Sequence, residues 1–409
     1  MKKFNEFHKF SKSEISNILM NECYTFEKII NEIKPDIFLT LETALRPHHF
    51  FYLLCKAKGV KILMLNAANW GDYCYISEEY HRLTNFKELF ENRSSQSVKF
   101  ESLQELLEKN IRSKKHTKFF AVQQKNKISR IKAILETLLL SDESTRKSHY
   151  TYYGRTKSKI ILNEILIRSK RYFRKKFIDK NFLYKIPDNK KFIFFPLQQE
   201  PERSLLISTP DYIDQLKTID LILKSIPENY ILVVKEHPTQ GPPNRDWRKI
   251  SDYKSLLANP KIKLIHPSVD AKNIIKKSSL VISVSGTISL ESSFFNIPSI
   301  TFANNDYPLI KSISKMNSIS DLKDLILDMM VKNTNPSDVK NYFDILMENS
   351  FEFDLLTFQA TYLKYLYLDA NLLDTKITEN QMKLLLENQK DTLTNLAKNF
   401  EIKINQNSF

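Results

Sequence analysis

The chain has 409 residues, 42% of them hydrophobic, and a formal net charge of +15 at pH 7. This length allows two domains of ordinary size, and the charge favours an anionic partner such as a nucleotide, an acidic glycan or an anionic lipid. Three cysteines without paired spacing exclude a disulfide framework and fit a reducing compartment. No apolar run reaches the roughly 18 residues of a membrane-spanning helix and the N-terminus lacks a secretion signal, so we expect a cytoplasmic protein.

Apolar stretches near the N-terminus predict a strand, a helix and a second strand. A helix at 26–33 stops before Pro35, and strands at 36–40 and 60–65 flank a helix at 50–57. This spacing is typical of a βαβ unit, whose two strands are parallel. The sequence therefore predicts an α/β fold for the N-terminal part.

The stretch from about Phe86 to Phe182 is helix-prone and strongly basic. We interpret it as helical insertions that belong to an N-terminal domain spanning 1–186. Within it, Arg168 to Ile178 mixes cations with aromatic residues, a composition suited to an anionic membrane surface. The alternative is a solvated helix face whose aromatic side chains pack inward.

A second α/β domain is predicted at 187–335, after a linker at Pro187–Asn189. Its expected strands are 192–197, 230–235, 262–265, 280–284 and 297–302, and its expected helices include 212–225 and 270–277. Residues 336–409 read as C-terminal helices.

The turn Ser285-Gly286-Thr287 lies between a predicted buried strand and a predicted helix. Either Ser285 or Thr287 can cap that helix. A strand, a glycine turn and a helix start place backbone N–H groups at the carboxyl end of a parallel sheet, which favours an anion. The alternative is an ordinary turn without a ligand.

Three polar groups each follow a predicted strand of the second domain. Because the carboxyl ends of parallel strands meet at one edge of a sheet, we expect the three groups to converge there. The candidate donor-binding residues are Gln198, Glu200, Glu202, Arg203, Lys235, Glu236, Pro238, Ser283, Ser285, Gly286, Thr287 and Glu291, and His237 is the catalytic candidate.

Each group suggests a chemical role. The amides of Gly286 and Thr287, with nearby hydroxyls, suit a phosphate, and His237 can donate a hydrogen bond to a leaving phosphate. Glu291 could accept from ribose hydroxyls. The alternatives are a loop histidine satisfied by the backbone and a surface carboxylate. His266-Pro267 repeats the dipeptide without the preceding Lys-Glu, so we interpret it as structural.

The three groups together resemble the capsule polysaccharide biosynthesis glycosyltransferases. The resemblance rests on Phe-Pro-Leu-Gln-x-Glu-Pro-Glu at 195–202, Lys-Glu-His-Pro at 235–238 and Ser-x-Ser-Gly-Thr-x-x-x-Glu at 283–291. It covers about 192–302, with a weaker echo at 34–65. These proteins resemble GT-B enzymes that use CMP-activated acidic sugars, including Kdo transferases, and bacterial sialyltransferases carry similar motifs.

The resemblance implies two Rossmann-like domains that face a cleft, with the donor on the second and the C-terminal helices packing back on the first. Carried over residue by residue, it implies that His237, Ser285, Gly286, Thr287 and Glu291 bind the nucleotide and its phosphate. No Asp-x-Asp pair follows a strand in a metal-binding context, so we expect a metal-independent mechanism without a cofactor. A nucleotide sugar and a glycan or glycolipid are the expected partners.

The acceptor is expected on the first domain, at the loops after its strands. We choose Glu42 as the base for the acceptor hydroxyl, although a carboxylate at a helix start can also serve as a cap. The other acceptor-side candidates are Arg46, His48, Asn66 and Asn69.

Three other functions compete with a glycosyltransferase of surface polysaccharide synthesis. A polyol-phosphate transferase of the teichoic-acid type shares the frame and a His-Pro motif, and a sugar-nucleotide epimerase is a further enzyme. A non-catalytic scaffold or anion-binding protein would also fit the charge. The sequence contains no recognised nucleic-acid-binding module, so we expect no nucleic acid partner.

Overall fold

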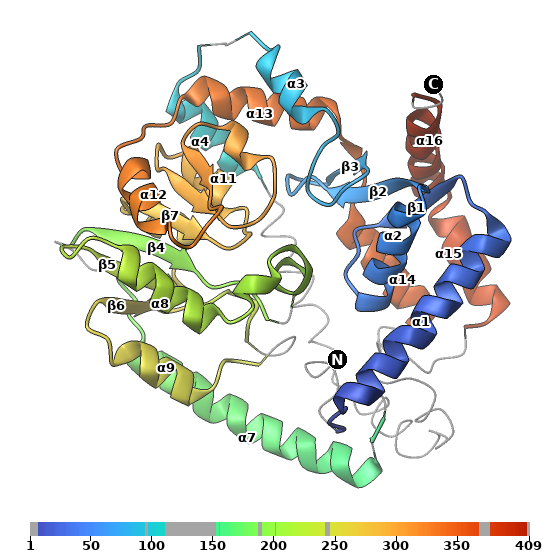
Figure 1. The fold of residues 1–409 in the computed structure, drawn as a ribbon, viewed down its shortest axis with the longest axis horizontal. Coiled ribbons are helices and arrows are strands. Elements are labelled where there is room, and N and C mark those ends of the chain that lie inside the picture. The colour runs from blue at the N-terminus through green and yellow to red at the C-terminus, as the bar shows by residue number, and fades with distance from the viewer. Residues whose placement is uncertain are drawn as a thin grey trace. The chain divides into compact units, whose positions relative to one another are not determined.

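The computed structural model describes residues 7–94, 97–110, 153–154, 156–186, 190–200, 202–241, 246–367 and 377–406 (Figure 1). The described residues divide between two compact units. Unit 1 takes those within Met1–Tyr80, Arg112–Arg168 and Ser350–Phe409, and unit 2 takes those within His81–Ile111 and Ser169–Asn349. The predicted linker at 187–189, Pro201, and the part of the predicted insertion at 111–152 lie outside the described residues.

Unit 1 is built on a four-stranded sheet in the order β1-β2-β3-β10. The strands are β1 (Ile37–Leu41), β2 (Lys61–Ala67), β3 (Tyr73–Ser77) and β10 (Phe351–Glu352). The parallel pairing of β1 with β2 confirms the predicted βαβ unit. β3 runs antiparallel to β2, because Asn69 (φ 58°) and Gly71 (φ 50°) adopt the left-handed conformation and reverse the chain.

Helices cover both faces of the unit 1 sheet. On one face lie α1 (Lys12–Ile33) and α2 (Arg46–Ala57), which pack on Ile62 and Met64. On the other face, α14 (Leu355–Tyr367) and α16 (Lys390–Gln406) pack on Leu63 and Leu65. α15 (Glu379–Asn388) lies between them in the chain. α1 begins well before the predicted residue 26, because Ser11 and Glu14 form a capping box.

Unit 2 contains a six-stranded, fully parallel sheet in the order β6-β5-β4-β7-β8-β9 (Figure 1). The strands are β4 (Phe192–Pro196), β5 (Ile231–Lys235), β6 (Ile262–Ile265), β7 (Leu280–Ser283), β8 (Ser299–Thr301) and β9 (Ile313–Lys315). They read as continuous apolar runs because helices cover both faces of the sheet. This sheet confirms the predicted α/β class.

The helices of unit 2 form two layers around this sheet. One layer holds α8 (Gln215–Ser225), α9 (Ile250–Leu257) and α12 (Leu322–Met329), and the other holds α10 (Ala271–Ile275) and α11 (Ile288–Ser293). α9, α12 and β9 are not among the elements predicted from the sequence. The core therefore comprises two apolar layers, one on each side of the strands.

Three helices that the predicted division places outside the second domain pack within unit 2. They are α3 (Phe86–Glu91), α4 (Phe100–Lys109) and α13 (Pro336–Glu348). The rings of Phe86 and Tyr342 lie 4.6 Å apart, and Arg93 makes a fork of 2.8 and 2.7 Å to Glu348. Residues 81–110 therefore pack with the second sheet, whereas the predicted division assigns them to the first domain.

α7 (Lys157–Asn181) has residues in both units. In its unit 2 part, Ile178 is 1% exposed and belongs to the core of that unit, and Phe177 packs against it. The Arg171 Nε lies 2.5 Å from Asp246 Oδ1, and the Arg174 Nη1 donates to the Trp247 carbonyl at 2.7 Å. One side of this basic segment is therefore a structural face.

Candidate functional site

The chain order of unit 2 creates a switch point between β4 and β7. After β4 the chain adds β5 and β6 on one side, and it then crosses back to add β7, β8 and β9 on the other side. In open parallel sheets, ligands bind outside the carboxyl ends of the strands at such a point. The loops that follow β5, β4 and β7 lie next to one another at this edge, so the predicted convergence of the three polar groups is confirmed.

Gln198, Ser283 and Gly286 join the loops after β4 and β7. The Gln198 Nε2 lies 3.4 Å from Ser283 Oγ, and the Gly286 N–H donates to the same oxygen at 2.9 Å. A Cβ added to Gly286 would lie 3.2 Å from both Gln198 Nε2 and Ser283 Oγ. A larger residue here would press on both side chains, and the Gly286 amide, which we expect to face a phosphate, is bound to Ser283 instead.

The expected helix cap after this turn is wrong, because neither hydroxyl accepts a backbone N–H from the first turn of α11. The Thr287 Oγ1 donates to Glu291 Oε1 at 2.8 Å. The buried Ser285 Oγ has no hydrogen-bond partner within the described part of the chain. Buried hydroxyls are nearly always paired, so Ser285 marks a place where a ligand oxygen could complete the hydrogen bonding.

His237 follows β5 and is half-buried. Its Nδ1 accepts the Thr239 backbone N–H at 3.2 Å and lies 2.8 Å from Thr239 Oγ1. Because Nδ1 accepts this bond, the neutral ring carries its proton on Nε2, which makes Nε2 the donor. Pro238, the next candidate, is exposed. The loop thus presents an oriented imidazole at the edge of the sheet.

Arg248 is a site residue that sequence reasoning missed. Its side chain is 8% exposed and reaches Glu236 Oε2 at 3.0 Å, Glu200 Oε1 at 2.9 Å and the Gln198 carbonyl at 3.3 Å. Burial alone would lower the Arg248 pKa, but the two carboxylates raise it above its ordinary value. Its partners come from two distant loops, so no local sequence pattern signals this role.

Two further ionisable side chains near this edge have shifted pKa values: Lys235, which is buried at the end of β5, and Glu291, which is half-buried in α11. Burial lowers the pKa of Lys235 to about 8, although Asp270 and Glu236 oppose this change. Burial also raises the pKa of Glu291, while the Thr287 hydroxyl acts in the opposite direction. Glu291 is therefore a desolvated carboxyl group rather than the surface carboxylate of the alternative interpretation.

Glu202 and Arg203 make local contacts. The Ser204 hydroxyl donates to Glu202 Oε2 at 2.9 Å, and Arg203 Nη1 donates to Ser208 Oγ at 2.9 Å across a π-helical turn at Ser204–Ser208. These side chains help to shape the loop after β4.

The acceptor-side candidates of unit 1 are largely engaged in structural contacts. Arg46 forms a two-pronged ion pair with Glu22, and His48 Nε2 lies 2.5 Å from Thr40 Oγ1. Asn66 is fully buried and its Nδ2 reaches the Met64 carbonyl at 3.1 Å. Asn69 is a turn residue with positive φ. Glu42, in the loop after β1, is half-buried, and its role as the base stays a prediction.

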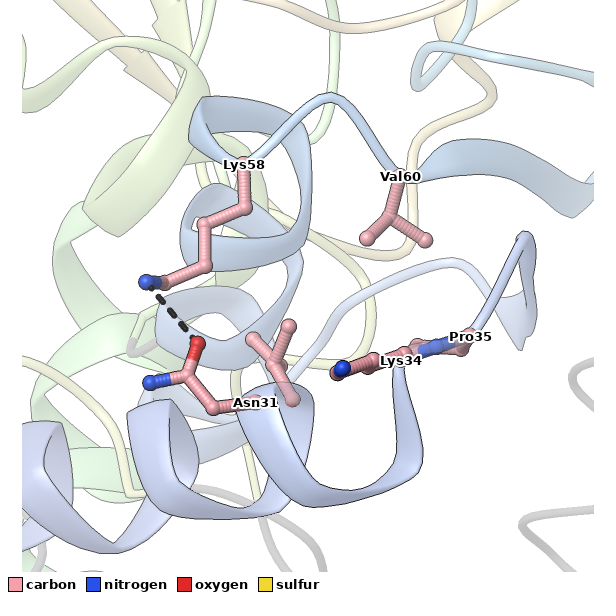
Figure 2. A pocket seen from close by; sticks show the side chains of 6 residues that line it. Asn31, Lys34, Pro35, Lys58 and Val60 are labelled. Carbon is pink, nitrogen blue, oxygen red and sulfur yellow. Dashed lines mark hydrogen bonds between the residues drawn. The ribbon is translucent and has the colours of Figure 1, made fainter.

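A shallow hollow of about 440 Å³ in unit 1 lies away from these candidates (Figure 2). It is lined by Ile30, Asn31, Lys34, Pro35, Lys58 and Val60. These residues surround the amino ends of β1 and β2, whereas the functional edge of a parallel pair is the carboxyl end. The Lys58 Nζ lies 3.3 Å from Asn31 Oδ1 and 2.8 Å from Glu27, so its charge is compensated.

Within the described ranges, no group of three or more His, Cys, Asp or Glu could hold a metal ion.

The chain is similar to solved structures, and two of these come from Thermosulfurimonas dismutans and Methanocaldococcus jannaschii. KpsC, a β-Kdo 2,7-transferase from Thermosulfurimonas dismutans, is 13% identical, with 82% of this chain and 97% of that chain covered and a TM-score of 0.35. The UDP-GlcNAc 2-epimerase of Methanocaldococcus jannaschii, in complex with UDP-GlcNAc and UDP, is 12% identical over 84% and 83% of the two chains, with a TM-score of 0.26. A search of curated proteins gives no match.

A family model supplies the decisive comparison. The model described as "Capsule polysaccharide biosynthesis protein" matches residues 93–309, just over half of the chain. The match contains all three blocks, at 195–202, 235–238 and 283–291, so it confirms the resemblance drawn from them. The chain belongs to the capsule polysaccharide biosynthesis protein family.

Proposed function

We propose that this protein is a metal-independent glycosyltransferase that moves a CMP-activated acidic sugar to a surface polysaccharide or glycolipid acceptor. Family membership supports the polysaccharide product, and the net charge of +15 suits an anionic donor and acceptor. The observation that carries the proposal is the unpaired, buried Ser285 hydroxyl at the switch point of the sheet. It lies where parallel sheets bind nucleotides and can donate to a phosphate oxygen.

The chemistry assigned to this edge is stabilisation of a leaving phosphate. When the bond between the sugar and the donor phosphate breaks, negative charge develops on CMP, and the acceptor hydroxyl forms the new bond and loses its proton to a base. His237 Nε2 is oriented by the contact of Nδ1 with Thr239, and it can donate to that phosphate. Glu42 is the proposed base on unit 1.

The buried residues beneath this edge hold the loops rather than the ligand. Gln215 Oε1 accepts the Gln198 N–H at 2.7 Å, and Gln240 Oε1 accepts the Glu200 N–H at 2.7 Å. These amide contacts fix the backbone after β4 before any ligand arrives, which lowers the entropy cost of binding. The donor side of the proposed site is thus preorganised.

Titration with CMP and with UDP, followed by calorimetry, tests the donor site. We expect CMP to bind and Ser285→Ala to weaken it about tenfold, the loss of one hydrogen bond to a charged group. Ser278→Ala is the matched control, because Ser278 is a buried serine before β7, at the opposite end of the strand. If CMP fails to bind, or if both variants bind it equally, the phosphate site does not lie here.

We also propose that α7 associates with an anionic membrane surface. No described helix is long and apolar enough to cross a membrane. Exposed apolar side chains of α7 recur at helical spacing on one face, and exposed cations accompany them. The apolar residues are Leu162, Ile165, Leu166, Tyr172 and Phe173, and the cations are Arg168, Lys170, Lys175 and Lys176.

A further inference from the structure

The guanidinium of Arg248 forms hydrogen bonds with both of the loops that follow β4 and β5. It contacts Gln198 and Glu200 in the first loop and Glu236 in the second. We infer that Arg248 is a positioning residue, which fixes His237 and the loop after β4 in the geometry that sugar transfer requires. This inference rests on the proposed function, and it assigns Arg248 no direct contact with the substrate.

The path from Arg248 to His237 runs through the two oxygens of one carboxylate. Glu236 Oε2 accepts from Arg248 Nε at 3.0 Å and from the Tyr253 hydroxyl at 2.8 Å. The other oxygen, Oε1, accepts the His237 backbone N–H at 3.2 Å. Since the Glu236 side chain is fully buried, it has no freedom to adopt another orientation. Arg248 therefore fixes the orientation of the Glu236 carboxylate, and that carboxylate fixes the position of the His237 backbone, which carries the imidazole.

A second path runs from Arg248 to the loop after β4. Glu200 Oε1 accepts from Arg248 at 2.9 Å and from Gln215 Nε2 at 2.7 Å. Gln215 Oε1 in turn accepts the Gln198 N–H at 2.7 Å. The same guanidinium thus positions the backbone of Gln198, whose side chain contacts Ser283 across the switch point.

Stability alone does not explain a buried ion network of this kind. Well-packed apolar residues often support a core as well as a buried ion pair does, because charges pay a large desolvation cost. What a guanidinium adds is a rigid fork of N–H donors that holds several acceptors at fixed angles. Its single positive charge also offsets part of the negative charge of Glu200 and Glu236, which would otherwise repel an anionic phosphate at this edge more strongly.

Arg248→Lys separates geometry from charge, because lysine keeps the cation and loses the fork. We expect this variant to fold and to bind CMP within a few-fold of wild type. Its kcat should fall about a hundredfold, as for a small misplacement of a reacting group.

A second variant, Arg248→Met with Glu200→Gln and Glu236→Gln, removes all three charges and should show the same selective loss of kcat. Arg93→Met is the matched control, since Arg93 forms a similar fork to Glu348 away from this edge. Arg248→Lys with wild-type kcat, or full kcat in the neutral triple variant, would overturn the inference.

A readout that does not depend on transfer keeps this test separate from the proposed function. Backbone amide hydrogen exchange in the free, full-length protein reports the bond from His237 N–H to Glu236. We expect exchange at His237 to be at least about tenfold faster in Arg248→Lys, with Val233 in β5 unchanged. Equal exchange at His237 would refute the positioning role even if transfer is observed. Faster exchange at His237 without transfer in the wild type would support the role and leave only the glycosyltransferase proposal refuted.

Discussion

Gln198 Nε2 lies 3.4 Å from Ser283 Oγ, although 85 positions separate the two residues in the sequence. The contact exists because β4 and β7 are neighbours in the sheet, with Ile193 opposite Leu280. It joins two loops at the switch point of the sheet and places Gly286 against both side chains.

His237→Ala is expected to lower kcat by about a hundredfold or more, because it removes one donor to the leaving phosphate. The protein should remain folded, since the side chain is only half-buried. His266→Ala provides the control: this second His-Pro histidine stacks on Tyr184 at 4.2 Å and faces Asp179, so it should affect stability and spare the rate. Steady-state kinetics that give both variants the same rate would remove His237 from the mechanism.

Gly286→Val is expected to weaken CMP binding at least about tenfold and to change the unfolding free energy less. The added side chain would press on Gln198 and Ser283, which lie 3.2 Å from the position of its Cβ. Gly59→Ala is the contrasting control. Gly59 has a φ of 74° with no atom near its Cβ position, so alanine there should cost about 1 kcal/mol of stability and leave affinity intact. Calorimetry and denaturant unfolding measure the two quantities, and unchanged affinity in folded Gly286→Val would place the ligand elsewhere.

Lys235→Met is expected to stabilise the protein in a pH-dependent way. Burial lowers the Lys235 pKa to about 8 from its ordinary 10.5, a difference worth at most roughly 3 kcal/mol. Between these pH values the unfolded chain binds more protons than the folded protein, so the wild type gains stability from this residue as pH rises. The advantage of the methionine variant should therefore be largest at pH 7 and shrink between pH 8 and 10.5. Denaturant unfolding at several pH values would show it, and a constant difference would contradict the assignment.

Flotation with anionic vesicles should show binding that falls as salt rises. Each basic residue near such a surface contributes on the order of 1 kcal/mol. Replacing Lys175 and Lys176 by Gln and Tyr172 and Phe173 by Ser should reduce flotation without affecting transfer to a soluble acceptor. Arg171 and Arg174 are left in place, because they bind Asp246 and Trp247. Equal flotation of this variant and wild type would make α7 a solvated helix face.

The sequence predicts the strands of unit 2 well because each is a short apolar run whose signal is local. β6 has the predicted bounds, and β4, β5 and β7 differ by a residue at their ends. β9 is three residues long, too short for a periodic signal, and β3 depends on a reversing turn. Runs of apolar residues therefore predict neither of these two strands.

The sequence predicts those residues of the candidate site that come directly after a strand. The convergence of the Gln198, His237 and Ser285 loops follows from parallel strands alone. The role of Arg248 does not, because its partners Glu200 and Glu236 lie 48 and 12 positions away. Thr287 shows a further limit: a hydroxyl before a helix predicts a cap, but this hydroxyl donates to the half-buried Glu291 side chain instead.

The central claim is that this protein transfers a sugar from a CMP donor. The direct measurement incubates the purified full-length protein with CMP-linked acidic sugars and, in parallel, UDP-GlcNAc, each with and without an oligosaccharide or glycolipid acceptor, and follows nucleotide release. We predict that CMP is released only when an acceptor is present, with the sugar recovered on that acceptor. Sugar interconversion without transfer would indicate an epimerase, and the absence of both nucleotide binding and release would indicate a scaffold; either result would contradict the account.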